Sequence, residues 1–392
     1  MTLPLRGRGP RFESGPAHPI MFRMEERLEW GKLATFVENK SIPIYNWFYY
    51  KEGFSRGLVM KFLDRFQPKI LLDPFCGSGT SLLACKEKGI DCIGYDTSKL
   101  AVLVSETKLI DWDVEELKAT LRKIKNIKFK RPPTGHVKKD IRKFFSRYAL
   151  EDALFLREII NDIDLPVRKF FLLVLINTIT KCSYIYKDGS MLRVVKRPLP
   201  PFRKYFFRRA EAMIKDVVKM KKRFKRCNAS VTEGDARNLS IEDSSVDLIM
   251  TSPPYLNKIE YTKIYRVEEY FVFGESSRKG VRSYIGLDTS KRYNIFPELN
   301  LPVIADAYFY DMQLCVREMY RVLNHNGIAV IVIGNACFPD RVIDSDILLA
   351  KIAKDAGFDI DVIYVVAKRF CTSNRTKKIG IMRESVLIMK KQ

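Results

Sequence analysis

The clearest sign of the architecture lies in residues 69–80, KILLDPFCGSGT. The first part, KILLDPFC at 69–76, is a short apolar run typical of a buried strand, and it ends at a glycine-rich turn. The next residues, TSLLACKEKG, have the pattern of a helix closed by Gly89, and DCIGYDTS at 91–98 is a second strand that ends in an acid. Strand, helix and strand in this order predict one βαβ unit, the building block of a parallel sheet.

The same alternation returns in the second half of the chain. We expect seven strands, and the last two are separated only by a loop, so they should pair as an antiparallel hairpin while the others run parallel. The predicted fold class is therefore α/β, a mostly parallel seven-stranded sheet with an antiparallel C-terminal hairpin. Besides 69–76 and 91–98, the expected strands are 229–237, 245–255, 327–336, 359–370 and 384–391.

A helical region with basic faces interrupts the alternation. It contains stretches such as YFFRRAEAMIKDVVKMKKRFKR, and between its helices residues 186–205 carry a D-G turn and several prolines, which indicates a loop or short hairpin. The sequence thus divides into four parts. We expect a partly disordered N-terminal tail at 1–41, a first half of the α/β domain at 42–110, an inserted basic helical lobe at 111–228, and a second half at 229–392.

The positive charge is concentrated in that lobe. Residues 115–228 hold 31 Lys and Arg against 11 Asp and Glu, which is a net charge of +20 out of the formal +23 of the whole chain. A charge that served only solubility would be spread over the sequence. The distribution therefore favours contact between the lobe and a polyanion, and nucleic acid is the partner we expect.

Several classes of protein are disfavoured by composition. The longest apolar run, at 170–180, is too short to cross a bilayer, and the first 30 residues lack the apolar core of a secretory signal. We therefore expect a cytoplasmic protein with no membrane partner. The eight cysteines form no C-x-x-C pair and the three histidines are scattered, so no metal site is predicted and the cysteines are expected to be buried free thiols.

The glycine turn DPFCGSGT at 73–80 excludes one common nucleotide site, the P-loop, and disfavours another, the dinucleotide-binding turn. A P-loop needs Lys after its final Gly, but Thr80 follows Gly79, and a dinucleotide fingerprint needs Gly where Leu82 stands. Two strand-end acids remain, Asp73 beside the turn and Asp96 at the end of the next strand. Asp96 stands at about the spacing at which a doubly wound fold places a carboxylate on ribose hydroxyls. A cationic or zwitterionic nucleoside fits this pattern better than a phosphate does.

Four motifs, DPFCGSGT, GYDTS, GDAR and TSPPY, closely resemble those of the S-adenosylmethionine-dependent amino-methyltransferases that modify exocyclic amines of nucleic-acid bases. The resemblance covers about residues 42–110 and 229–391, and it implies a Rossmann-like methyltransferase sheet with S-adenosylmethionine as cofactor. It also implies that Asp96 holds the cofactor's ribose and that Asp235 approaches its adenine amine. KEGFS at 51–55 resembles the segment that covers the methionine carboxylate and makes Ser55 a candidate. The resemblance implies that Asp73, Phe75, Gly77 and Gly79 line the methionine end, and Thr80 is a further cofactor-binding candidate.

The corner TSPPYLN at 251–257 ends a buried strand, because two prolines cannot stay in a sheet ladder. An exocyclic amine is a poor nucleophile, since its lone pair is delocalised into the ring. Ser252 Oγ and the Pro253 carbonyl on a rigid corner would accept its two N–H hydrogens and localise that lone pair, while Pro253 and Pro254 withhold competing donors. Tyr255 would stack on the flipped base. Direct in-line methyl transfer is expected.

The identity of the base and of the polymer is a finer question. In this family, the residue before P-P-Y is Asp, Asn or Ser. Ser252 resembles the members that methylate N4 of cytosine, whereas Asp is commoner in those that methylate N6 of adenine. We favour a site-specific N4-cytosine methyltransferase of DNA, with which a cognate restriction endonuclease would be associated. The alternatives are an rRNA or tRNA cytosine-N4 methyltransferase, an N6-adenine DNA methyltransferase, and an inactive nucleic-acid-binding scaffold.

Two regions are candidates for contact with the substrate. Residues 258–293 interleave aromatic and basic side chains and are expected to form part of the target-base pocket and a substrate loop. The loop of the lobe is expected to contact the phosphate backbone. Its candidate residues are Lys181, Lys187, Arg193, Lys196 and Arg197.

Overall fold

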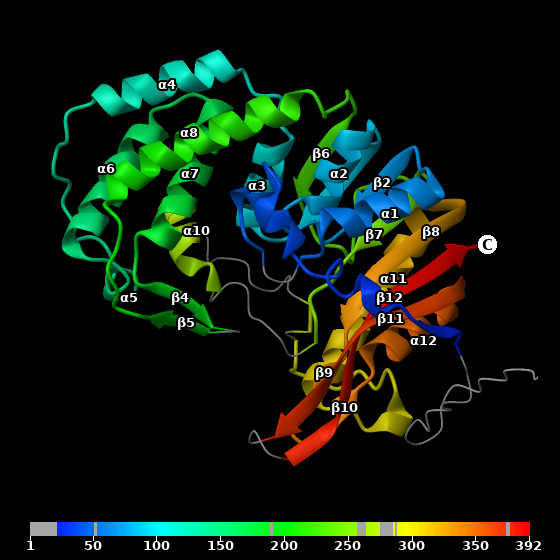
Figure 1. Ribbon diagram of the computed structural model, residues 1–392. Coiled ribbons are helices and arrows are strands. Elements are labelled where there is room, and N and C mark those ends of the chain that lie inside the picture. Colours follow the sequence, from blue (N-terminus) through cyan, green and yellow to red (C-terminus); the bar gives the residue numbers. More distant parts are fainter. Residues whose placement is uncertain are drawn as a thin grey trace, which may run out of the picture.

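The computed structural model describes residues 22–392 except 51–52, 189–190, 257–263, 275–284, 287 and 374–376. Its centre is an eight-stranded mixed sheet with the strand order β1-β11-β12-β8-β7-β2-β3-β6 (Figure 1). The strands are β1 (Met24–Glu26), β2 (Ile70–Asp73), β3 (Asp91–Asp96), β6 (Ala229–Glu233), β7 (Val246–Thr251), β8 (Leu323–Gly334), β11 (Phe358–Ser373) and β12 (Lys377–Lys391).

The strand pairing confirms the predicted fold class. β6, β3, β2, β7 and β8 pair in parallel in that spatial order, and β12 runs antiparallel both to β8 and to β11. All seven expected strands are present. The eighth, β1, pairs in parallel with the outer edge of β11, where Met24 lies opposite Ile363.

Helices cover both faces of the sheet. Neighbouring residues on a strand point to opposite faces, so Leu71 packs on the side of α1 (Arg56–Phe66) and α2 (Thr80–Lys88), whereas Leu72 packs toward α11 (Val303–Val322) and α12 (Ser345–Asp355). Because both faces are buried, the central strands are apolar runs without polar alternation. Such runs are visible in the sequence as strands.

The basic lobe is helical as expected and lies beside the β6 end of the sheet, with α3 (Lys99–Leu109) contacting both (Figure 1). Its core also takes residues from outside 111–228: Trp47 packs edge-on against Phe170, and Phe271 packs against Phe145. The lobe consists of α4 (Val114–Asn126), α5 (Lys139–Arg142), α6 (Arg147–Asn161), α7 (Val167–Lys181), α8 (Phe202–Lys221), the strands β4 (Ile185–Asp188) and β5 (Met191–Val194), and the later helix α10 (Arg266–Phe273).

The predicted N-terminal tail falls partly outside the described residues, which begin at 22. From there on the chain contains β1 and the short 3-10 helices η1 (Leu28–Trp30), η2 (Glu38–Ser41) and η3 (Tyr45–Trp47). Residues 258–263, 275–284 and 287 of the expected substrate loop also fall outside the described residues. Its described helix, α10, packs on α7 and α6 in the lobe.

The prediction of free thiols is wrong for two of the eight cysteines. Cys337 in β9 (Ala336–Cys337) forms a disulfide with Cys371 in β11, while the other six cysteines are free. β9 pairs with β10 (Val342–Ile343) and lies against β12, the partner of β11, so tertiary packing joins two cysteines that sequence spacing does not connect. Within the described residues, no helix combines the length and the apolar character that a bilayer crossing requires.

Candidate functional site

A cavity of about 60 Å³ lies where β2, β3, β6 and β7 end, and it is called the sheet cavity below. Carboxyl ends of parallel strands meet at one edge of a sheet, which is where open α/β sheets place their ligands. Six of the candidate residues line it: Phe75, Gly77, Asp96, Asp235, Ser252 and Pro254. The other lining residues are Tyr50, Pro74, Thr97, Ser98, Gly234, Ala236 and Ile285.

The glycine turn forms one wall of the sheet cavity and requires glycine for two reasons. Gly77 and Gly79 have φ values of +49° and +73°, a backbone region that other residues rarely adopt. A Cβ on Gly79 would also come within 2.9 Å of Ser105 Oγ, and that hydroxyl donates to the Gly77 carbonyl at 2.8 Å. The turn is therefore held tightly against α3.

Asp96 is fixed as an acceptor at the cavity wall. Its Oδ2 accepts from the Gly77 N–H at 2.9 Å, and its Oδ1 accepts from the Ser98 N–H at 2.8 Å. Desolvation raises the pKa of Asp96 to about 6, although the two backbone hydrogen bonds oppose the shift. At neutral pH the carboxylate is charged and retains lone pairs for a ligand's hydroxyl groups.

Asp73 does not line the sheet cavity. It is buried, and its carboxylate accepts from the Thr251 hydroxyl at 2.6 Å, from the Ser81 hydroxyl, and from the Phe75 N–H at 3.2 Å. Burial raises the pKa of Asp73 to about 6, against these hydrogen bonds. The residue joins the end of β2 to the end of β7 and to α2, so it fixes the glycine turn relative to the proline corner.

Beneath the glycine turn lies Lys108, which sequence reasoning did not single out. Its side chain is buried in α3, and its Nζ donates to the Ser78 carbonyl at 2.8 Å and to the Tyr45 carbonyl at 3.3 Å. No carboxylate in the described part of the chain forms an ion pair with it. Burial therefore lowers the pKa of Lys108 to about 7.

Asp235 is already engaged by a neighbouring guanidinium. Arg237 contacts its carboxylate through Nε and through Nη2, the latter at 2.6 Å, and reaches Asp311 Oδ1 with Nη1 at 2.9 Å. Asp311 in turn accepts from the Gly286 N–H at 2.7 Å. This network positions Asp235 at the cavity wall, where Ile285 is a neighbour in the lining.

The proline corner contributes Ser252 and Pro254 to the sheet cavity, while Pro253 is buried beside them. Tyr255 does not line the cavity, and its hydroxyl donates to Glu384 of β12 at 2.9 Å. Here the tyrosine ties the corner to the neighbouring part of the sheet. The expected stacking of Tyr255 on a base remains a prediction.

Ser55, Gly79 and Thr80 also lie outside the lining of the sheet cavity. Ser55 caps α1 by accepting from the Leu58 N–H at 3.2 Å, and Thr80 accepts from the amide of the buried Asn39 at 3.3 Å. Asn39 also receives the Arg56 N–H at 2.8 Å. These side chains secure α1 and α2 behind the turn.

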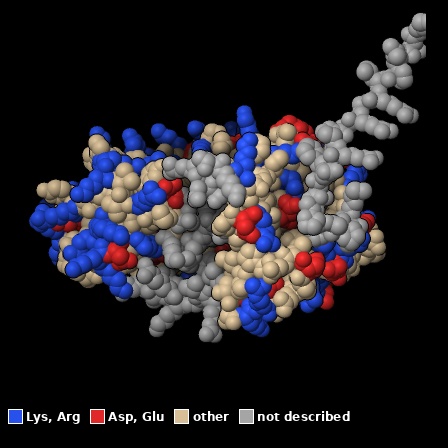
Figure 2. All heavy atoms as spheres, turned by 90° about the horizontal axis from the view of Figure 1, so that it is seen from below, with Lys and Arg blue, Asp and Glu red and all other residues tan. Residues whose placement is uncertain are grey.

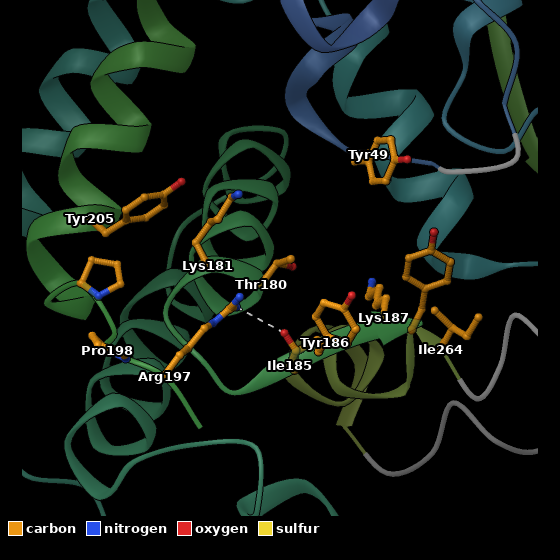
Figure 3. A pocket seen from close by; sticks show the side chains of 12 residues that line it. Tyr49, Thr180, Lys181, Ile185, Tyr186, Lys187, Arg197, Pro198, Tyr205 and Ile264 are labelled. Carbon is orange, nitrogen blue, oxygen red and sulfur yellow. Dashed lines mark hydrogen bonds between the residues drawn. The ribbon is translucent and has the colours of Figure 1, made fainter. Parts of the chain in front are cut away.

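Lys and Arg gather on the lobe, in the left half of Figure 2. Three of the five candidate contact residues, Lys181, Lys187 and Arg197, line a second and larger cavity of about 470 Å³, called the lobe cavity (Figure 3). Of the remaining two, Arg193 forms an exposed ion pair with Asp188 at 3.3 Å, and Lys196 is exposed.

The relatives found by comparison with known proteins all carry the name Type II methyltransferase. No protein-family model matches the chain. The chain is 24% identical over 461 residues to Type II methyltransferase M.BsoBI of Geobacillus stearothermophilus, which covers 92% of this chain and 88% of the relative. It is 26% identical over 416 residues to Type II methyltransferase M.AvaI of Nostoc sp., covering 88% and 85%. A shorter stretch of 74 residues, 18% of this chain and 14% of the relative, is 45% identical to Type II methyltransferase M.MjaII of Methanocaldococcus jannaschii.

Solved structures match only distantly. The rRNA methyltransferase aviRa of Streptomyces viridochromogenes superposes with a TM-score of 0.34 at 12% identity, covering 93% of this chain and 94% of that one. A SAM-dependent methyltransferase of Methanosarcina mazei gives a TM-score of 0.31 at 12% identity, covering 84% and 96%. At these scores neither structure bears on the function.

Proposed function

We propose that the chain is an S-adenosylmethionine-dependent methyltransferase that acts on an exocyclic amine of a DNA base, N4 of cytosine. The observation that carries the proposal is the sheet cavity, where Asp96 and the glycine turn meet Ser252 of the proline corner. Cofactor residues and amine-activating residues thus share one small space. Two relatives that match over most of their length carry the name Type II methyltransferase, which supports methyl transfer but does not bear on the base.

The residues of the sheet cavity fit the cofactor chemically. S-adenosylmethionine supplies an electrophilic methyl group on a sulfonium when it is bound. Asp96 accepts hydrogen bonds from the ribose hydroxyls, and the glycine turn leaves space that a Cβ on Gly77 would fill, since that atom would lie 3.2 Å from the Tyr50 ring. The cavity is smaller than ordinary ligand sites, so cofactor binding displaces part of its wall, and Tyr50 over Gly77 is the candidate.

The proline corner activates the amine. Ser252 Oγ and the Pro253 carbonyl accept the two N–H hydrogens and localise the nitrogen lone pair for attack on the methyl group. The rigidity of the corner matters, because acceptors that are already oriented need no reorganisation during the reaction. Asp73 and Thr251 act as positioning residues: their hydrogen bond sets the distance between the corner and the cofactor turn.

DNA is the polymer that these observations favour. The support for DNA is that all three relatives carry the name Type II methyltransferase. The concentration of Lys and Arg on the lobe supports binding to a phosphate backbone but does not distinguish DNA from RNA. The assignment of N4 of cytosine as the target atom rests on Ser252 in the proline corner. A cognate restriction endonuclease is the corresponding partner.

The proposal is tested with purified protein, S-adenosylmethionine carrying a labelled methyl group, and either genomic DNA or ribosomal RNA from a host that lacks the gene. Mass spectrometry of the digested nucleosides identifies polymer, base and atom together. We expect N4-methylcytosine in DNA, formed about 10²- to 10³-fold more slowly by Ser252→Ala. Label found only in RNA would contradict the assignment of DNA as substrate, and label on adenine would contradict the assignment of cytosine. No methyl transfer to either polymer would contradict the proposal that the protein is a methyltransferase.

A further inference from the structure

The lobe cavity has walls of an unusual composition. Its described lining includes four tyrosines, three cationic side chains and two prolines, and none of these described residues is a carboxylate. The tyrosines come from different parts of the chain: Tyr49 from the segment before α1, Tyr186 from β4, Tyr205 from α8, and Tyr265 from the start of α10. Figure 3 shows Tyr49, Lys181, Arg197 and Tyr205 placed around the opening. At about 470 Å³ the cavity falls in the size range of small-molecule sites.

One aromatic wall is free to take a ligand. Tyr186 is 48% exposed, and no ring or cation among the described residues lies against it. Tyr49 is similarly exposed, but the Lys40 ammonium lies 4.7 Å above its ring. Tyr265 carries the Lys187 ammonium at 3.9 Å and stacks on Tyr50. The fourth ring, Tyr205, has the Arg208 guanidinium 5.1 Å from its centroid. Tyr186 is therefore the ring that offers an open face to a flat partner.

Two of the three cations have no carboxylate partner among the residues that the structure describes. Lys187 is paired with the fully buried Glu268 at 2.6 Å, so its charge is compensated. Arg197 donates only to the Ser183 and Ile185 carbonyls, each at 3.3 Å, and no carboxylate in the described part of the chain pairs with Arg197 or with Lys181. The cavity therefore presents two positive charges beside an open aromatic face.

The lobe cavity is also next to the sheet cavity. Tyr50 lines the sheet cavity and Tyr265 lines the lobe cavity, and these two rings stack on each other with centroids 5.7 Å apart and planes inclined by 7°. The two cavities are thus separated by a pair of stacked rings. A polymer that reaches one of them passes close to the other.

We propose that the lobe cavity binds one unstacked nucleotide of the substrate strand, with its base on Tyr186 and its phosphate at Lys181 and Arg197. The inference rests on the proposed function and extends it, because it gives the enzyme a second nucleotide site outside the reacting cavity. Bases of any sequence can stack on an aromatic ring, so this site adds affinity and position more than sequence readout. A free nucleotide has the same base and phosphate, and the test separates the two sources.

The test measures binding of a fluorescent single-stranded 12-mer deoxyoligonucleotide by anisotropy at several salt concentrations. Tyr186→Ala should weaken binding about 5- to 100-fold through lost stacking, while Tyr186→Phe stays within about twofold of wild type. The double variant Lys181→Ala/Arg197→Ala should flatten the logarithmic salt dependence by about 1.4, the value for two single-strand phosphate charges. Lys123→Ala/Lys125→Ala is the matched control, since it removes two exposed charges from α4 of the same lobe.

Each outcome is decisive. Unchanged binding by Tyr186→Ala, or an equal loss in the α4 control, overturns the inference. Deoxycytidine monophosphate that binds as tightly as the 12-mer, with the same variant effects, identifies a free-nucleotide site instead and overturns the assignment to the polymer. Circular dichroism and S-adenosylmethionine binding check that every variant is folded. Methyl transfer by wild type to DNA is measured in parallel, so failure of this inference is distinguishable from failure of the proposed function.

Discussion

The burial of Lys108 allows a prediction about how the stability of the protein depends on pH. Its pKa is about 7 in the folded protein against an ordinary value of 10.5, so between pH 7 and 10.5 the unfolded chain binds more protons at this side chain than the folded one. The free energy of unfolding therefore rises with pH in that window. Integration of the linkage relation between pH 7 and pH 9 gives an increase of about 2 kcal/mol from this group. Lys108→Met removes the titrating group and should lose that increase.

The assay is urea denaturation of wild type and Lys108→Met at pH 7, 8 and 9. Lys99→Met is the control, because Lys99 lies exposed in the first turn of the same helix, α3. Other groups titrate equally in all three proteins, so only the difference between them reports on Lys108. From pH 7 to pH 9, the free energy of unfolding of wild type should rise by about 2 kcal/mol relative to that of Lys108→Met. A constant difference would show that Lys108 stays charged when folded and would refute the reasoning.

Three further predictions concern the sheet cavity. Ser252→Ala should lower kcat about 10²- to 10³-fold with little change in cofactor affinity, as measured by steady-state kinetics and calorimetry; unchanged turnover would remove its role as an acceptor. Cofactor affinity of wild type should fall as pH drops below about 6, because protonation of Asp96 removes its charge, and this dependence should be absent in Asp96→Asn. Thr251→Val should destabilise the protein by about 1–3 kcal/mol at pH 8 in denaturant titration, since Asp73 loses a buried donor; wild-type stability would contradict this.

The central sheet can be predicted from the sequence because its strands are buried on both faces. Apolar runs that end at a glycine-rich turn or at a pair of prolines are distinctive, and they place Gly77, Asp96 and Ser252 at or just after the ends of strands. These three residues meet at the sheet cavity, because parallel strands bring their carboxyl ends to one edge. Local pattern is sufficient for this part of the site.

Other features depend on contacts that no local pattern contains. β1 has three residues, two of them glutamates, and becomes a strand only because the edge of β11 is available to it. Lys108 looks like any helical lysine until the fold places it under Ser78. Lys187 is a candidate for phosphate contact by sequence, yet Glu268, far along the chain, neutralises it. Long-range pairing of charges and edges therefore limits what the sequence alone predicts.

The insertion of the lobe between β3 and β6 has a consequence for how the protein folds. β2 pairs with β3 close by in sequence, but its other neighbour, β7, follows only after α4 to α8 of the lobe. β1 pairs with β11, which lies more than 300 residues later in the sequence. Contacts of such long range are closed late and slow folding. During synthesis, the β2 edge therefore stays unpaired until β7 has emerged, and the reacting cavity is assembled after α4 to α8 of the lobe have been made.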